Sequence, residues 1–154
     1  MNVIHLPDAA STEAFGRRLA PLLRRGDIIA LFGTLGAGKT SLCRGILHGL
    51  GLAGDVPSPT FPIVVTYDPP EVRLPVWHVD LYRIEDPGEL EELGLDDALS
   101  AAALLIEWPE RLPFLWPETL RLSLEADPSG GRRLTATPPP AWERRWPPPP
   151  LSIP

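Results

Sequence analysis

Residues 33–40 read Gly33-Thr34-Leu35-Gly36-Ala37-Gly38-Lys39-Thr40, and this stretch decides the fold. Its spacing, a glycine, four residues and then Gly-Lys-Thr, is the pattern of a phosphate-binding loop. Lys39 is the only lysine of the chain, and every other permanently positive side chain is an arginine. A lysine suits this position because its compact, mobile ammonium can follow the β- and γ-phosphates of a nucleotide, whereas the wide planar guanidinium of arginine does not fit the same turn.

The sequence on both sides of this loop favours the same interpretation. The apolar run 27–32 before it is typical of a buried strand. Apolar side chains at helical spacing follow it, namely Leu42, Cys43, Ile46, Leu47 and Leu50, and Gly49 and Gly51 are candidate helix ends. Strand, glycine loop and helix together place an anion-binding nest of backbone N–H groups at the helix start. The Thr40 hydroxyl then lies where Mg2+ is expected.

The rest of the chain predicts a sheet with helices on its flanks. Ser11 or Thr12 is expected to cap a first helix, and short helical stretches interrupted by Gly94 are expected within 86–99. Strands are expected at 63–67, 74–79, 101–106, 120–124 and 132–137. The first two of these strands form a hairpin, and the last two can pair. We therefore predict an α/β fold of the P-loop NTPase class, with a central, mostly parallel sheet, an antiparallel hairpin and flanking helices.

Length and composition predict one main domain. We assign 1–137 to a P-loop ATPase domain and 138–154 to a proline-rich C-terminal tail, because 8 of these last 17 residues are proline. Such a segment is expected to be an extended or disordered appendage. The single Cys43 excludes an internal disulfide and is interpreted as a small core residue. No run of about 18 apolar residues and no secretory signal is found, so a cytoplasmic protein is expected.

The net charge of −6 is distributed unevenly. Residues 1–67 carry +2, residues 68–127 carry −11 and residues 128–154 carry +3. The acidic middle segment disfavours a broad nucleic-acid footprint there. Its acidic stretch 85–97 is interpreted as a solvated helix face, with a docking surface for a basic partner as the alternative.

Two acidic residues close predicted strands, where a P-loop site needs a carboxylate for Mg2+. Glu107 follows the most continuously apolar run of the chain, as expected for a strand covered on both faces. Asp80 closes the run Val76-Trp77-His78-Val79. We expect Glu107 near the metal or the attacking water and Asp80 as a second carboxylate nearby. The alternative for both is an ordinary acid leaving the sheet, and His78 is interpreted as a packed strand residue.

Two further residues are candidates beside the nucleotide. Thr60 lies in the proline-stiffened loop 56–62, and a threonine there can sense the γ-phosphate as switch loops do. The alternative is a hydroxyl bonded to its own backbone. Trp108 directly follows Glu107 and can stack on the nucleotide or cover the site. The alternative is a core lid, because Pro109 follows it.

Read in order, these motifs closely resemble the TsaE family, the small bacterial ATPases of tRNA threonylcarbamoyladenosine biosynthesis. The resemblance covers residues 12 to about 125. It rests on residues 33–40, then Ser58-Pro59-Thr60-Phe61, His78-Val79-Asp80-Leu81-Tyr82-Arg83, Glu89-Leu90, Leu93-Gly94-Leu95 and Ile106-Glu107-Trp108-Pro109-Glu110. The phosphate loop alone is shared with many NTPases, whereas the ordered set of the other motifs is far more specific.

The resemblance implies binding of ATP and Mg2+ with weak intrinsic hydrolysis. It implies metal contacts from Thr40 and Glu107, and catalytic roles for Lys39, Asp80, Glu107 and Thr60. The nucleotide-binding residues implied are Thr12, Gly33, Thr34, Leu35, Gly36, Ala37, Gly38, Lys39, Thr40, Ser41 and Trp108. The family acts with a TsaD-like synthase subunit and its TsaB-like relative, and tRNA is reached through that complex. The ATPase resets the complex between turnovers and does not transfer the group itself.

Two departures from the family pattern are visible. Thr34 stands where the family often has an aspartate, which should matter little because backbone builds the nest, and the proline-rich tail has no counterpart.

Two other functions stay open. A small-molecule P-loop kinase would need an acceptor pocket and usually an arginine-rich lid, but residues 68–127 hold only four arginines. A nucleotide-gated interaction module would need binding without turnover. A GTPase is disfavoured because its Asn-Lys-x-Asp motif needs a second lysine.

Overall fold

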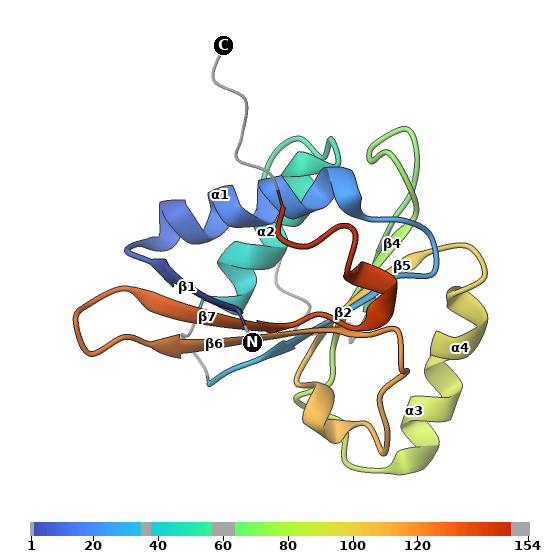
Figure 1. Ribbon diagram of the computed structural model, residues 1–154. Helices are drawn as coiled ribbons and strands as arrows, with labels where there is room; N and C mark the ends of the chain where they lie inside the picture. The colour runs from blue at the N-terminus through green and yellow to red at the C-terminus, as the bar shows by residue number, and fades with distance from the viewer. Residues whose placement is uncertain (1, 35–37, 57–63, 149–154) are drawn as a thin grey trace.

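A single seven-stranded sheet forms the centre of the protein, in the strand order β1-β7-β6-β2-β5-β4-β3 (Figure 1). The structure is a computed structural model, and it describes residues 2–34, 38–56 and 64–148. Among these residues no helix is both long enough and apolar enough to cross a membrane.

The middle of the sheet is parallel. β2 (Ile28–Phe32) pairs in parallel with β5 (Ala103–Glu107) on one side and with β6 (Leu120–Ala126) on the other. β5 pairs in parallel with β4 (Val76–Asp80). Every residue of β5 is buried, as its continuous apolar run predicts for a strand covered on both faces. The predicted α/β fold is confirmed, and three parallel strands, β2, β5 and β4, end at one edge of the sheet.

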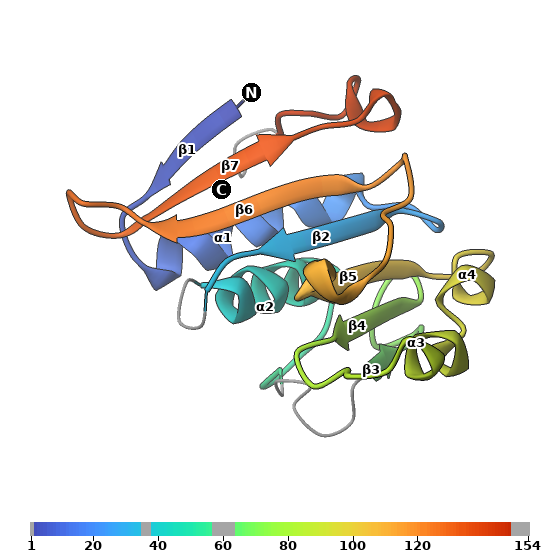
Figure 2. The ribbon, with the colours of Figure 1, turned by 90° about the horizontal axis from the view of Figure 1, so that it is seen from below.

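The two sides of the sheet are closed by antiparallel strands. β3 (Val64–Tyr67) forms the predicted hairpin with β4. β7 (Arg132–Thr137) pairs with β6, also as predicted, and its other side takes up β1 (Asn2–Leu6). The sequence analysis did not predict β1, a five-residue strand in which only Ile4 and Leu6 pack against the core. Figure 2 shows β1 at the outer edge, beside β7.

Helices cover both faces of this sheet. α1 (Ala9–Leu19) and α2 (Lys39–Gly49) lie together on one face (Figure 2). They approach so closely that a Cβ at Gly16 or Gly45 would collide with the backbone of the other helix. α3 (Pro87–Leu93) and α4 (Leu95–Ala98) are separated by the left-handed Gly94, as the sequence suggests, and the second core layer includes Leu95 and Ala98.

The predicted cap of the first helix is wrong by a few residues. α1 begins at Ala9, and its N-cap is Asp8 rather than Ser11 or Thr12. The Asp8 carboxylate accepts hydrogen bonds from the Ser11 hydroxyl at 2.7 Å and from the Ser11 backbone N–H at 2.8 Å. These two bonds lower the pKa of Asp8. Ser11 and Thr12 already lie inside α1, so neither can be its N-cap.

The described part of the C-terminal segment, residues 138–148, packs against the rest of the protein. A short 3-10 helix, Pro140–Trp142, buries the Trp142 side chain in the core beneath α1. The Arg145 guanidinium stacks on the Trp142 ring, 3.9 Å from its centroid, and forms an ion pair of 2.6 Å with Asp27 at the start of β2. The expectation of an extended or disordered tail is therefore wrong for 138–148. The division of the chain at residue 137 stays a prediction.

We predict that Trp142→Ala lowers the free energy of unfolding by about 3–5 kcal/mol, because it removes a fully buried aromatic side chain. Urea unfolding monitored by circular dichroism measures the loss. Glu143→Ala, one residue away at an exposed position, is the matched control and should change the free energy by less than about 0.5 kcal/mol. A similar small change in both variants would contradict the packing of this segment.

Candidate active site

The phosphate loop connects β2 with α2, as the sequence predicts. Gly33 and Thr34 follow directly after β2, and α2 begins at Lys39. Gly38, the N-cap of α2, has a φ of 103°, a left-handed conformation that glycine adopts without strain. Leu35, Gly36 and Ala37 lie outside the described residues, and so does Thr60.

Lys39 is buried at the start of α2, with 5% of its surface exposed. Its ammonium has no hydrogen-bond partner among the described residues and lies over the Trp108 ring, 4.0 Å from the centroid. Burial lowers the pKa of Lys39, and the carboxylates of Glu107, Glu110 and Asp80 oppose that shift. A buried cation without a hydrogen-bond acceptor is unfavourable, so this position suits an anionic ligand.

The first turn of α2 and two neighbours surround the loop. Thr40 and Ser41 stand in this turn, half-buried. Thr12 of α1 is buried, and its methyl group lies 3.7 Å from the position that a Cβ on Gly38 would take. Arg132, the first residue of β7, lies 3.8 Å from the same position. The sequence placed Thr12 near the nucleotide but missed Arg132, because only the β6–β7 pairing brings that arginine to the loop.

Asp80 and Glu107 meet at the ends of their strands. Asp80 is the last residue of β4 and Glu107 the last residue of β5, and the parallel register sets them opposite each other. Glu107 is buried, whereas Asp80 is half-buried and accepts a hydrogen bond of 2.9 Å from the Tyr82 backbone N–H. Burial raises the pKa of Asp80, and the nearby Glu107 adds to the rise. Two close carboxylates repel each other, which a divalent cation would relieve.

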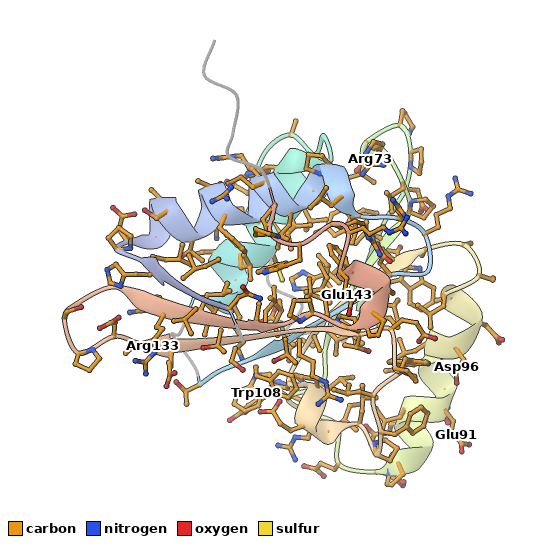
Figure 3. All side chains as sticks on the ribbon, in the orientation of Figure 1. Arg73, Glu91, Asp96, Trp108, Arg133 and Glu143 are labelled. Carbon is orange, nitrogen blue, oxygen red and sulfur yellow. The ribbon has the colours of Figure 1, made fainter. Side chains whose placement is uncertain are left out.

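Trp108 closes the site from the loop after β5. It is the only non-glycine residue among the described ones with a positive φ, at 57°, and such a conformation requires support from its surroundings. Its ring contacts Lys39 on one side and lies 4.9 Å from the Tyr82 ring on the other. Figure 3 labels Trp108 where the chain leaves the sheet. The tryptophan therefore covers the phosphate-loop lysine.

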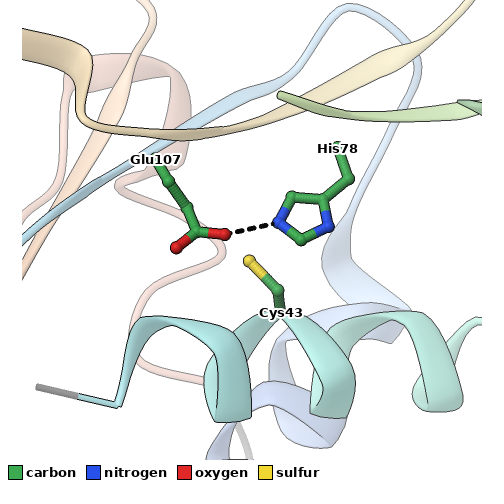
Figure 4. Close-up of side chains that lie close together, drawn as sticks. All are labelled: Cys43, His78 and Glu107. Carbon is green, nitrogen blue, oxygen red and sulfur yellow. Dashed lines mark hydrogen bonds and ion pairs between the residues drawn. The ribbon is translucent and has the colours of Figure 1, made fainter. Parts of the chain in front are cut away.

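A second, fully buried group lies behind Glu107. The Nε2 atom of His78 and the Oε2 atom of Glu107 are 2.7 Å apart, and the Cys43 thiol of α2 points toward this pair (Figure 4). One ligand atom from each of the three residues lies within 4.8 Å of the other two. Thiol and imidazole suit Zn2+ rather than Mg2+, which prefers oxygen ligands. Mg2+ is therefore not expected between these three side chains.

The sequence interpretation of Cys43 and His78 is partly confirmed. Both are buried in the core, as predicted for a small core thiol and a packed strand residue, and burial raises the pKa of the Cys43 thiol well above its usual range. The hydrogen bond from His78 to Glu107 was not predicted. The register pairs His78 with Leu105 and Asp80 with Glu107, so the bond joins residues two positions apart along neighbouring strands, and no local pattern in the sequence signals it.

Comparison with known proteins gives consistent results. Residues 6–134 match the model of a family described as "Threonylcarbamoyl adenosine biosynthesis protein TsaE". A protein of that name from Synechocystis is 47% identical over 117 residues, which cover 71% of each chain. Another from Streptomyces coelicolor is 46% identical over 112 residues, which cover 71% of this chain and 76% of the relative.

A solved structure shares the fold as well. The crystal structure of Bacillus subtilis YdiB is similar with a TM-score of 0.72 and 29% sequence identity, and the match covers 89% of this chain and 84% of that chain. The family match spans the phosphate loop, both strand-end carboxylates and Trp108. The chain belongs to the TsaE family of threonylcarbamoyl adenosine biosynthesis proteins.

Proposed function

We propose that this protein is a weak Mg2+-dependent ATPase that drives the complex forming threonylcarbamoyladenosine on tRNA. The partners are a TsaD-like and a TsaB-like subunit, and tRNA is engaged through them in the cytoplasm. The observation that carries the proposal is the buried Lys39 ammonium, which has no hydrogen-bond acceptor among the described residues and lies close enough to Glu107 and Asp80 for their charges to act on it.

Each residue of the site has a role that follows from its place. Lys39 and the backbone at the start of α2 bind the phosphates, and their positive charge stabilises negative charge that develops during hydrolysis. Thr40 and Glu107 would hold Mg2+, which neutralises phosphate charge when bound. Asp80, half-buried and facing solvent more than Glu107 does, orients the attacking water. Trp108 limits the access of bulk water to the phosphate loop.

The remaining predicted residues complete the nucleotide site in this proposal. Thr12 lies beside Gly38 at the start of α2, and we place the adenosine part of ATP near it. Ser41 lies one residue after Thr40, within reach of the nucleotide phosphates. Thr60 senses the γ-phosphate from its loop, and residues 33–38 wrap the phosphates.

A small-molecule kinase is the weaker candidate. A kinase needs an acceptor pocket that opens beside the transferred phosphate. The groove of about 470 Å³ between α3, α4 and residues 112–116 is lined by none of the proposed phosphate or metal residues. An acceptor bound there would not meet the γ-phosphate, so this groove gives the kinase no support.

The central test is ATP hydrolysis by the purified chain, alone and with the TsaD-like and TsaB-like subunits plus tRNA. We expect slow turnover alone and strong stimulation by the complex. Lys39→Ala and Glu107→Ala should each lower the stimulated kcat by about 10²–10³-fold, because the first removes a positive charge that stabilises the transition state and the second removes a carboxylate that would hold Mg2+. Turnover that ignores the complex, or that demands a small-molecule phosphate acceptor, would refute the proposal.

Glu107→Gln separates an enzyme from a nucleotide-gated interaction module. The amide keeps the size of the side chain but removes its charge. We expect this variant to bind ATP and the partner subunits but to support little tRNA modification, measured by nucleoside analysis of the product. Full modification activity without hydrolysis would instead establish the module, in which binding alone is sufficient.

We further predict that Lys39→Met weakens ATP binding without lowering the stability of the fold. The thioether chain keeps the packing on Trp108 but removes a buried ammonium without a hydrogen-bond acceptor, so the free energy of unfolding should stay the same or rise. The lowered pKa of Lys39 leads to the same expectation. The folded state disfavours the protonated lysine, so its positive charge reduces the stability of the fold. ATP affinity, measured by calorimetry, should fall at least about tenfold. A large loss of stability would show that the ammonium supports the fold.

A further inference from the structure

His78 is the middle residue of β4, and the site residue Asp80 ends the same strand. It stands two residues before Asp80, on the same face of the strand, and it has no exposed surface. Its neighbours on that face of the sheet include Val76 and Leu105, which belong to the apolar core under α2. An imidazole at this depth needs a hydrogen-bond partner, and Glu107 provides one.

The hydrogen bond has one possible direction when Glu107 is ionised. A carboxylate can only accept, so Nε2 of His78 carries the proton and donates to Oε2 at 2.7 Å. The other carboxylate oxygen lies on the side away from the imidazole (Figure 4). The bond therefore fixes the rotamer of Glu107 and leaves one oxygen for a ligand outside the core.

Stability alone does not account for an imidazole at this position. The Nδ1 atom of His78 is buried and has no hydrogen-bond partner among the described residues. A buried polar atom without a hydrogen-bond partner destabilises a fold. Since an apolar side chain would avoid this loss among the surrounding aliphatic residues, the benefit of the imidazole must lie in what it does to Glu107.

We propose that His78 is a positioning residue that holds the Glu107 carboxylate with one oxygen directed to Mg2+. This inference rests on the proposed ATPase function and adds a residue to its site. His78 itself touches neither nucleotide nor metal in this proposal. Partners behind a metal-ligating group commonly change metal affinity or activity by about 10–100-fold when they are removed, and we expect that range here.

Two substitutions separate hydrogen bonding from packing. His78→Leu fills a similar volume without a donor, whereas the amide of His78→Gln can donate from a position close to that of Nε2. We expect His78→Leu to lower kcat by about 10–100-fold and to raise by a similar factor the Mg2+ concentration needed for half-maximal activity. At saturating Mg2+ the KM for ATP should stay within about threefold, because the phosphate loop is unchanged. His78→Gln should recover most of the loss.

Cys43→Ala is the matched control, because Cys43 of α2 lies beside the pair and has no role in the proposed nucleotide or metal site. Its kinetic constants and Mg2+ dependence should match those of the parent chain. Circular dichroism and urea unfolding show whether each variant is folded. Equal losses in folded His78→Leu and His78→Gln, or Mg2+ dependence of His78→Leu within about twofold of the parent, would overturn the proposal.

A readout without turnover distinguishes failure of this inference from failure of the ATPase proposal. Calorimetry measures Mg2+ binding to the complex with a non-hydrolysable ATP analogue, and a weaker Mg2+ affinity in His78→Leu alone supports the inference even if the parent chain proves inactive. Imidazole 15N NMR should show a protonated Nε2 whose hydrogen bond disappears in Glu107→Ala. Unchanged Mg2+ affinity together with an unchanged imidazole signal would overturn it whatever the ATPase activity.

Discussion

The parallel register of β2, β5 and β4 is the constraint on which the site depends. Because parallel strands present their carboxyl ends at one edge, the phosphate loop, Glu107 and Asp80 reach the same place from three distant stretches of chain. A shift of β5 by one residue would turn Glu107 to the opposite face, away from Lys39 and from the His78 hydrogen bond. The same register therefore brings together the cation, the two carboxylates and the residue behind them.

The elements that could be predicted are those with a local signal. The phosphate loop is recognised by spacing, and β5 by an apolar run that ends at Glu107. The β3–β4 hairpin follows from two apolar stretches around a turn with two prolines. Asp80 and Glu107 could be singled out because each is the first acid after such a stretch. Their mutual position could be expected, but only the observed strand order makes them neighbours.

What could not be predicted depends on partners far away in the chain. β1 is too short for the alternation of Ile4 and Leu6 to predict a strand, and its pairing with β7 joins the two ends of the described chain. Arg132 reaches the phosphate loop through the same edge pairing. The many prolines of 138–148 predict an unpacked segment, but two of its aromatic side chains pack against the core. Trp142 is buried within the core, and Trp146 packs edge-on against Phe15. The Asp8 cap is different, because an acid directly before two alanines is a local signal that favours a helix start.

The ion pair between Arg145 and Asp27 has a consequence for synthesis on the ribosome. Asp27 precedes the strand that carries the phosphate loop, so that strand is anchored at its start by a residue near the end of the chain. The pairing of β1 with β7 likewise cannot form until β7 has been synthesised. A nascent chain that already contains every nucleotide-binding residue therefore still lacks the contacts that complete its sheet and core. The pairing of β1 with β7 and of Asp27 with Arg145 therefore forms only after the chain has been synthesised as far as residue 145, which makes these contacts late steps of folding.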